Sequence, residues 1–147
     1  MTDRMPPRAL VTITEREALE LAATMTVGRL AHVHQDQLFI TPVNFLLDDR
    51  DAVLRTAEGT GLLAAARSIA SAALEVDDLV DWSRSGWSVL IRGQLTEVTD
   101  AADIRRVLGE LHPWAGGERQ HVLRLSGEQV TGRRIEPGPG AITVIQV

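Results

Sequence analysis

Hydrophobic and polar residues alternate over several short stretches of the chain, a pattern that is typical of half-buried strands. Pro42 lies inside one of these stretches and requires an edge position, a bulge or a break there, and Gly93 allows a bulge or a sharp bend in the longest one. The pattern predicts six strands, over residues 27–34, 38–47, 52–57, 71–76, 87–98 and 121–125.

Helical periodicity replaces the alternation in three places. Thr14 and Glu17 form a capping box that opens a helix, with Ala18, Leu19, Leu21 and Ala22 as its apolar stripe. An alanine-rich helix follows the turn at residues 58–61, and Asp100 caps a third helix. The remaining predictions are a loose leader over residues 1–12, an acidic irregular loop over 77–85, a loop over 113–117 and a candidate terminal strand over 138–147.

Strands of uneven length joined by tight turns, with three helices, predict a mainly β protein of the α+β class. The bends at Pro42 and Gly93 favour a closed small barrel over a flat sheet. No repeat or linker divides the chain, so we expect a single domain over residues 1–147.

Composition narrows the possible functions. The net charge of -5 gives no basic surface for nucleic acid, and no apolar run suggests a signal peptide or a membrane span, which favours the cytoplasm. Cysteine and lysine are both absent, which excludes disulfides, thiolate sites, Schiff bases and Walker A loops. Any reaction would therefore depend on a bound cofactor.

Four segments in order resemble the pyridoxamine 5'-phosphate oxidase-like family of FMN-binding split-barrel proteins. These segments are Val27-Gly28-Arg29-Leu30-Ala31, Thr41-Pro42-Val43-Asn44-Phe45, Arg55-Thr56-Ala57 with Gly59-Thr60-Gly61-Leu62, and Trp87-Ser88-Val89-Leu90-Ile91-Arg92-Gly93. The resemblance implies a six-stranded antiparallel Greek-key split barrel with flanking helices. It also implies a homodimer that binds FMN at the subunit interface and works as an oxidoreductase on an unidentified small molecule.

The resemblance also implies positions for the cofactor. The strand around Asn44 would run along the isoalloxazine ring, the turn after Arg55 would bind the phosphate, and the strand that begins at Trp87 would come from the second subunit. The predicted cofactor-binding residues are Pro42, Val43, Asn44, Arg55, Thr56, Ala57, Thr60, Gly61, Leu62, Trp87, Ser88, Val89 and Trp114.

The phosphate assignment has a physical basis. A strand ending in Arg55 and Thr56, followed by a glycine turn into a helix, offers a guanidinium, a hydroxyl and backbone amides to one phosphate. A structural turn with a surface Arg–Glu pair is the alternative. Gly61 stands where family members commonly carry lysine, so this chain lacks one phosphate-binding charge.

Several alternatives stay open. His32 and His34 share a strand face and could ligate a metal, although no third ligand is apparent; the alternative, which we favour, is that they are polar residues at the edge of the barrel near the flavin. Asn44 would either hydrogen-bond to the edge of the flavin ring or bond to backbone groups beside the break at Pro42. Trp114 would either stack on a planar ligand or fill a dimer interface. The competing functions are reduction with F420, haem binding by His32, His34, His112 or His121, and a non-enzymatic flavin-binding module.

Overall fold

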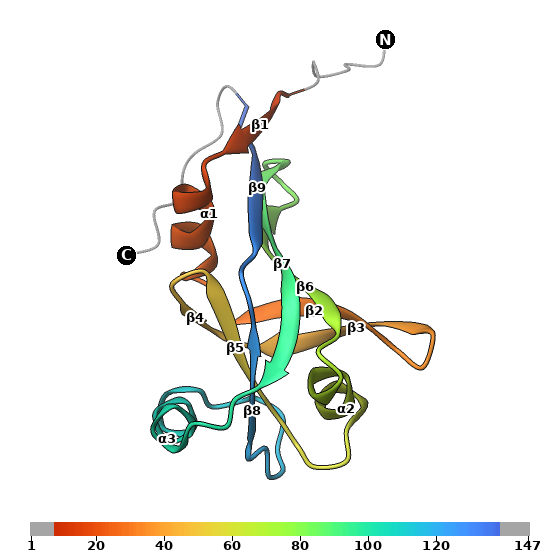
Figure 1. Cartoon of the computed structure of the whole chain (residues 1–147). Coiled ribbons are helices and arrows are strands. Elements are labelled where there is room, and N and C mark those ends of the chain that lie inside the picture. Colours follow the sequence, from red (N-terminus) through yellow and green to blue (C-terminus); the bar gives the residue numbers. More distant parts are fainter. Residues whose placement is uncertain (1–7, 139–147) are drawn as a thin grey trace.

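The computed structural model describes residues 8–138, which form nine strands and three helices (Figure 1). In chain order these are β1 (Leu10–Ile13), α1 (Glu15–Ala22), β2 (Val27–His34), β3 (Gln37–Asn44), β4 (Leu46–Asp48), β5 (Asp51–Thr56), α2 (Gly61–Arg67), β6 (Ser71–Val80), β7 (Ser85–Glu97), α3 (Ala101–Glu110), β8 (His121–Leu125) and β9 (Gln129–Ile135). None of these helices is long and apolar enough to cross a membrane.

The strands pair antiparallel in the order β3-β2-β6-β7-β8-β5-β4, and β9 adds to β7 and carries β1 on its other side. β7 pairs with β6 and β9 along most of its length and with β8 from Leu95 onward. The change of partner occurs around Gly93, where an added Cβ would lie only 1.7 Å from the Ser126 carbonyl oxygen. Only glycine permits this close approach. Gly93 therefore allows β7 to pass from its pairing with β6 and β9 to its pairing with β8.

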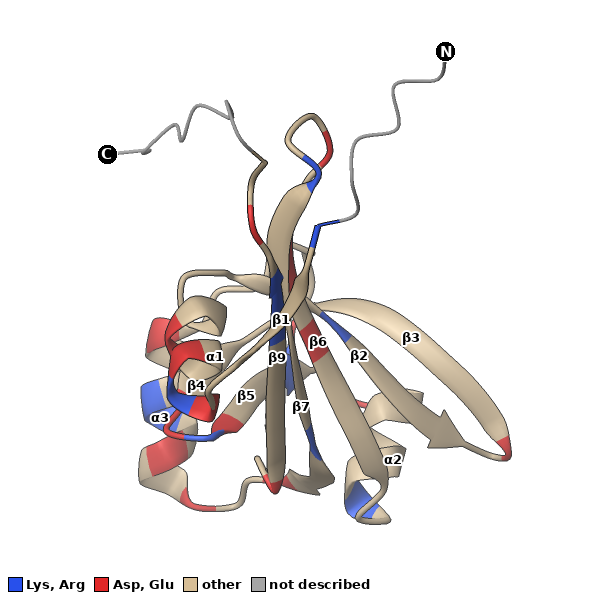
Figure 2. Cartoon of the chain, turned by 90° about the horizontal axis from the view of Figure 1, so that it is seen from above, with Lys and Arg blue, Asp and Glu red and all other residues tan. Residues whose placement is uncertain are grey.

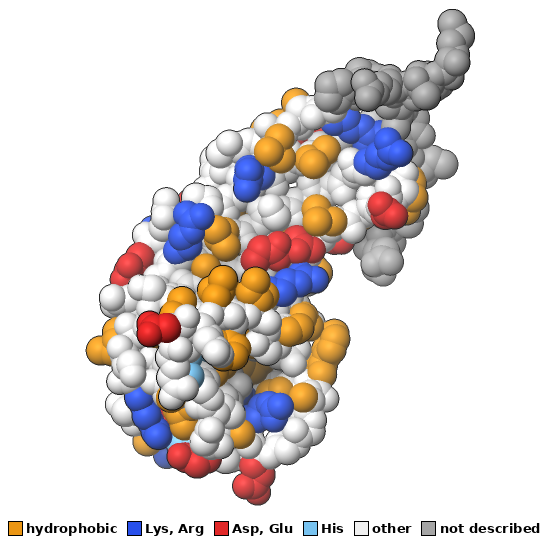
Figure 3. All heavy atoms as spheres, turned by 90° about the vertical axis from the view of Figure 1, so that its right-hand side faces the viewer, with side chains coloured by type: hydrophobic (Ala, Val, Ile, Leu, Met, Phe, Trp, Pro, Cys, Tyr) orange, Lys and Arg blue, Asp and Glu red, His pale blue; other side chains and the backbone are white. Residues whose placement is uncertain are grey.

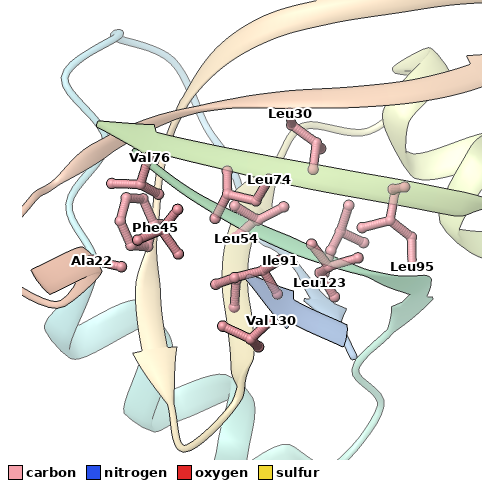
Figure 4. Packing of buried hydrophobic residues seen from close by; sticks show 14 of the residues in the cluster. Ala22, Leu30, Phe45, Leu54, Leu74, Val76, Ile91, Leu95, Leu123 and Val130 are labelled. Carbon is pink, nitrogen blue, oxygen red and sulfur yellow. The ribbon is translucent and has the colours of Figure 1, made fainter. Parts of the chain in front are cut away.

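The core lies between the inner faces of these strands (Figure 4). Leu54 from β5, Leu74 from β6 and Ile91 from β7 are fully buried there and pack in one cluster with Leu30, Leu95 and Leu123. Fully burying a side chain of this size contributes roughly 1.5–3 kcal/mol. A smaller cluster around Val107 attaches α3 to the β5–β8 side of the sheet.

Each helix begins at a side-chain cap that the sequence contains. The Thr14 hydroxyl accepts a hydrogen bond from the Glu17 amide, the Thr60 hydroxyl from the Leu63 amide, and the Asp100 carboxylate from the Asp103 amide. Such caps satisfy amides that the first helical turn leaves without partners. The predicted helices are therefore confirmed, and Ala18 and Ala22 of α1 are buried as the apolar stripe requires.

All six predicted strands are present, and the α+β class and split-barrel architecture are confirmed. The predicted strand over residues 38–47 breaks at Phe45, whose side chain is buried in the core while its amide donates to the Thr26 carbonyl. Pro42 lies on β3, an edge strand, as expected.

The predicted acidic loop over residues 77–85 is wrong. β6 continues to Val80 because Asp77 pairs with Ser88 and Val80 with Ser85, and only residues 81–84 turn. The loose leader is also wrong at residues 10–12, because β1 pairs with β9 in register Leu10 to Ile135. β9 itself was not predicted. Of the candidate strand over 138–147, residues 139–147 lie outside the described part of the chain.

Candidate functional site

A pocket with a cavity volume of about 340 Å³ opens between β2, β3, β5, the start of α2 and the loop over residues 113–119. This size is within the range of small-molecule sites. Its walls contain apolar side chains, such as Leu30 and Val43, and polar ones, such as Arg55 and Thr56. The lining residues are Leu30, His32, Phe39, Thr41, Pro42, Val43, Asn44, Arg55, Thr56, Thr60, Gly61, Leu62, Pro113, Ala115 and Arg119.

Two arginines give the pocket its charge. Arg55 extends from β5 and Arg119 from the 113–119 loop, and no carboxylate within 4 Å pairs with either among the described residues. Among residues 8–138, no aspartate or glutamate lines the pocket, although the chain as a whole carries a net charge of -5. A positive pocket in an acidic protein favours an anionic ligand.

Arg55 also holds the wall of the pocket together. Its Nε donates to the Arg119 carbonyl at 2.8 Å and its Nη1 donates to the Leu111 carbonyl at 2.7 Å. These two bonds fix both ends of the segment that crosses the pocket after α3. One guanidinium therefore positions the loop and faces the cavity at the same time.

The hydroxyls beside the arginines belong to the cap of α2. Thr56 Oγ1 and Thr60 Oγ1 lie 2.8 Å apart, and Thr60 also contacts the Ala57 carbonyl at 3.1 Å. This network fixes the turn at residues 57–60 against the end of β5. Gly61 begins α2 with ordinary helical geometry, and a Cβ added there would lie 3.4 Å from His34 Cδ2, an ordinary contact distance.

Asn44 joins β3 to the same loop. Its Oδ1 accepts a hydrogen bond from the Trp114 amide at 2.9 Å, and its Nδ2 donates to the Thr26 carbonyl at 3.2 Å. Both ends of the side-chain amide therefore satisfy backbone groups. The Trp114 indole is exposed, whereas its neighbours Pro113 and Ala115 line the cavity.

Histidines occupy two different surroundings near the pocket. His32 is buried in the wall and its ring stacks on Phe39, with centroids 5.4 Å apart. His121 lies outside the cavity, where its Nε2 is 2.5 Å from Glu58 Oε2 and its Nδ1 is 2.9 Å from Glu97 Oε2. The guanidinium of Arg67 beside Glu97, together with His121, lowers the pKa of that carboxyl. Within residues 8–138, no three His, Cys, Asp or Glu side chains gather in a way that could hold a metal.

The structure brings together many of the predicted cofactor-binding residues, since Pro42, Val43, Asn44, Arg55, Thr56, Thr60, Gly61 and Leu62 all line the pocket. Ala57 and Trp114 are next to the lining without belonging to it. Trp87 and Val89 pack into the core of their own chain, and Ser88 lies on the outer face of β7.

Several lining residues were not among the predicted cofactor-binding residues, and Arg119 and His32 matter most among these. No motif near Arg119 identifies it as a pocket residue, because it lies in an irregular loop whose path cannot be predicted from local sequence. His32 had a signal, since Leu30 and His32 alternate on the inward face of β2. The other missed lining residues are Leu30, Phe39, Thr41, Pro113 and Ala115.

The outer face of the sheet is apolar at its edge and charged at its centre. β3 carries no charged residue between Gln37 and Asn44, as its ribbon shows (Figure 2), and Leu38 and Ile40 are exposed beside Val33 of β2. From the side, hydrophobic side chains surround a mixed group of acidic and basic ones, and the molecule is hollowed at one end (Figure 3).

The charged centre includes Arg29, Glu75 and Asp77. Arg29 Nη1 lies 3.0 Å from Asp77 Oδ2 but 3.5 Å from Glu75 Oε1, so it favours the aspartate. Burial, together with the neighbouring Asp77, raises the pKa of Glu75 to about 7. Glu75 Oε1 has no hydrogen-bond partner, which agrees with the long distance to Arg29: the guanidinium offsets little of the cost of burying a charged carboxylate.

Comparison with known proteins agrees with this fold. The chain is 36% identical over 132 residues to the uncharacterized protein Rv0080 of Mycobacterium tuberculosis, an alignment that covers 87% of each chain. It is 31% identical to the FAD binding protein of Mycobacterium smegmatis, whose structure superposes with a TM-score of 0.70 over 85% of this chain and 98% of that one. A Mesorhizobium loti protein, 22% identical with a TM-score of 0.72, shares the fold over 88% of this chain and 99% of its own.

The sequence model of one protein family covers most of the barrel. It matches residues 14–134, from the cap of α1 to β9, and so includes every pocket residue described above. The chain therefore belongs to the pyridoxamine 5'-phosphate oxidase family.

Proposed function

We propose that this protein binds a flavin nucleotide, with the phosphate next to the ribityl chain bound between Arg55 and Arg119. The observation that carries the proposal is the charge of the pocket: two guanidiniums without carboxylate partners face a cavity that contains no acidic side chain. Arginine suits phosphate because its planar fork donates two parallel hydrogen bonds. Thr56 and Thr60 hold the turn beside it in place, because their hydroxyls bond to each other and that of Thr60 also bonds to the Ala57 carbonyl.

The apolar side chains of the lining suit the isoalloxazine ring. Leu30, Val43 and Leu62 line the cavity together with Pro42, whose missing amide leaves that part of the edge strand without a donor. A flat ring packed on β3 would bury this surface while its polar edge reached Asn44. When bound, the flavin would supply electron transfer, so the protein would act as an oxidoreductase by orienting the ring and leaving one face open to a substrate.

FMN and FAD are the two candidate cofactors. The family resemblance favours FMN. The M. smegmatis relative described as an FAD binding protein favours FAD, because it is 31% identical and aligned over 98% of its own length. The two cofactors share the ring and the first phosphate, so the pocket described here would serve both. They differ in an adenylate group that would extend past the rim near Arg119.

We propose further that the protein is a homodimer and that its outer sheet face is the interface. The exposed Val33, Leu38 and Ile40 form an apolar edge on this face, and such patches on soluble proteins mark association surfaces. Ser88 lies on the same face, paired with Asp77 and Arg133, and therefore points away from the pocket of its own chain. In a twofold dimer its side chain would instead approach the partner's pocket.

Absorption and binding measurements test the cofactor. The purified protein should show a flavin spectrum, or acquire one on titration, and should bind FMN and FAD more tightly than riboflavin, which has the ring without phosphate. A haem Soret band, a deazaflavin spectrum from F420, or equal affinity for riboflavin and FMN would contradict the proposal.

Mixing two variants tests the shared site. Arg55→Ala would damage the pocket and Ser88→Trp would obstruct the partner's pocket, so each homodimer should bind FMN weakly. A heterodimer of the two would contain one site with both defects and one intact site. Recovery of tight binding after mixing supports the shared site, and a monomer mass of 16.0 kDa at micromolar concentration would refute it.

A further inference from the structure

In the described part of the chain, His32 is the one titratable side chain other than arginine that lines the pocket. His32 is only 6% exposed, and its ring stacks on Phe39, which lies directly opposite on β3. The side chain of His32 lies on the inward face of β2 together with Leu30. His32 is therefore a buried polar group in the wall of the pocket.

The two ring nitrogens of His32 differ. Nδ1 is sealed from solvent and has no hydrogen-bond partner, whereas Nε2 is not among the sealed atoms. A protonated imidazole would need acceptors at both nitrogens, and a neutral one with its proton on Nδ1 would bury an unpaired donor. Unpaired buried donors are rarer than unpaired buried acceptors. The arrangement therefore favours the neutral tautomer with the proton on Nε2.

An unpaired buried nitrogen lowers the stability of the ligand-free protein, so a role in ligand binding would explain why a histidine occupies this position. A phenyl ring would fill the same space without this cost. Burial, and to a smaller extent the charge of His34, lower the pKa of His32, which keeps its ring neutral near neutral pH. The feature that a phenyl ring lacks is the Nε2–H donor.

We propose that His32 is a ligand-binding residue whose Nε2–H donates a hydrogen bond to an acceptor atom on the ring of the bound flavin. The inference rests on the proposed function and adds a contact to the ring rather than to the phosphate. Stacking on Phe39 fixes the direction of the bond, and the partner-free Nδ1 fixes which nitrogen carries the proton.

The test compares His32→Phe with His34→Phe in binding of riboflavin and FMN. His32→Phe keeps the shape and the stacking, so it should raise the Kd of both ligands by the same factor, about three- to tenfold, as expected for one neutral hydrogen bond. The FMN to riboflavin ratio should not change. His34→Phe makes the same substitution two residues along the same strand at a position outside the cavity lining, and should leave riboflavin binding near the wild-type value.

Two further readouts separate a binding role from a structural one. The thermal midpoint of ligand-free His32→Phe should equal or exceed that of the wild type, because an unpaired nitrogen is removed. Nitrogen-15 NMR of the ligand-free wild type should show the Nε2–H tautomer, and its signal should shift when riboflavin binds. Unchanged riboflavin affinity in His32→Phe, or a proton on Nδ1, would overturn the inference. If the wild type binds no flavin, the proposed function itself has failed.

Discussion

Arg55 donates a hydrogen bond of 2.8 Å to the backbone carbonyl of Arg119, so one pocket arginine positions the other. A second bond from Arg55 to Leu111 fixes the far end of the same loop. The charge of the pocket and the order of its wall thus depend on one side chain. We therefore expect substitution of Arg55 to have a larger effect than substitution of Arg119.

Arg55→Ala should weaken FMN binding more than Arg119→Ala does. Loss of a hydrogen bond to a charged group costs roughly 1.5–3 kcal/mol, which is about a ten- to hundredfold increase in Kd by titration. Because two loop carbonyls also lose their donor, the thermal midpoint of ligand-free Arg55→Ala should fall by several degrees. Arg16→Ala removes the same charge from an exposed position and is the matched control. Equal FMN binding by Arg55→Ala and this control would place the phosphate elsewhere.

Gly61→Lys should tighten the binding of FMN but not of riboflavin. Gly61 has no positive φ, and its Cβ would meet only the edge of His34, so a lysine fits without backbone strain. Its ammonium would join the two guanidiniums beside the phosphate. Gly109→Lys adds the same charge on α3, where a Cβ meets nothing within 4 Å, and should change neither affinity. The same lysine should also partly restore FMN binding to Arg119→Ala. If the stable Gly61→Lys variant gains nothing for FMN over riboflavin, the turn at residues 59–62 holds no phosphate.

Asn44→Ala should release the loop that carries Trp114. The Trp114 amide donates to Asn44 Oδ1, so its hydrogen exchange should accelerate in the variant, as measured by NMR or mass spectrometry. The Leu63 amide, which the Thr60 cap protects, serves as an internal reference and should exchange as before. Flavin affinity should fall for FMN and riboflavin together, because the wall formed by Pro113 and Ala115 loses its support. Unchanged exchange at Trp114 would show that the loop is held by other contacts.

The contribution of Glu75 to stability should fall as pH rises from about 4.5 to about 7. Its pKa is raised from an ordinary value of 4.5 to about 7, so in this range the folded protein keeps a proton that the unfolded chain has lost. This contribution is complete below about pH 4.5 and is lost through about pH 7. Urea titrations at fixed protein concentration should show a flatter dependence of stability on pH in Glu75→Gln than in the wild type. Identical slopes for Glu75→Gln and wild type would contradict the assignment.

Local patterns predicted the fold well where neighbouring residues determine the structure. The caps at Thr14, Thr60 and Asp100 and the alternation along β2 depend on residues close in sequence. β1 was missed because its strand character comes from pairing with β9 across more than a hundred residues, such as Leu10 with Ile135. β9 was missed because its other partner, β7, is also distant in sequence. The end of β6 was missed for a different reason: it belongs to a local hairpin with β7, and acidic residues at 77 and 78 are tolerated on this exposed hairpin.

The site was predictable on the strands and unpredictable on the loop. Residues 42–44 and 55–62 carry the family resemblance and converge on one pocket. Arg119 reaches that pocket only because Arg55 holds an irregular segment, a long-range contact without a sequence signature. Trp87 was assigned to the site by position, but the alternation of β7 places it with Val89 and Ile91 on the core side.

The partner change at Gly93 has a consequence for how the protein folds. β7 is continuous through this point, so the sheet region of β6 and β9 and the region of β8 and β5 share one strand. Neither half can complete its hydrogen bonding while the other is unfolded, and the contacts that close the barrel join distant parts of the chain. Denaturation should then be a single cooperative transition with slow refolding, and separately expressed halves should remain unstructured until they are combined.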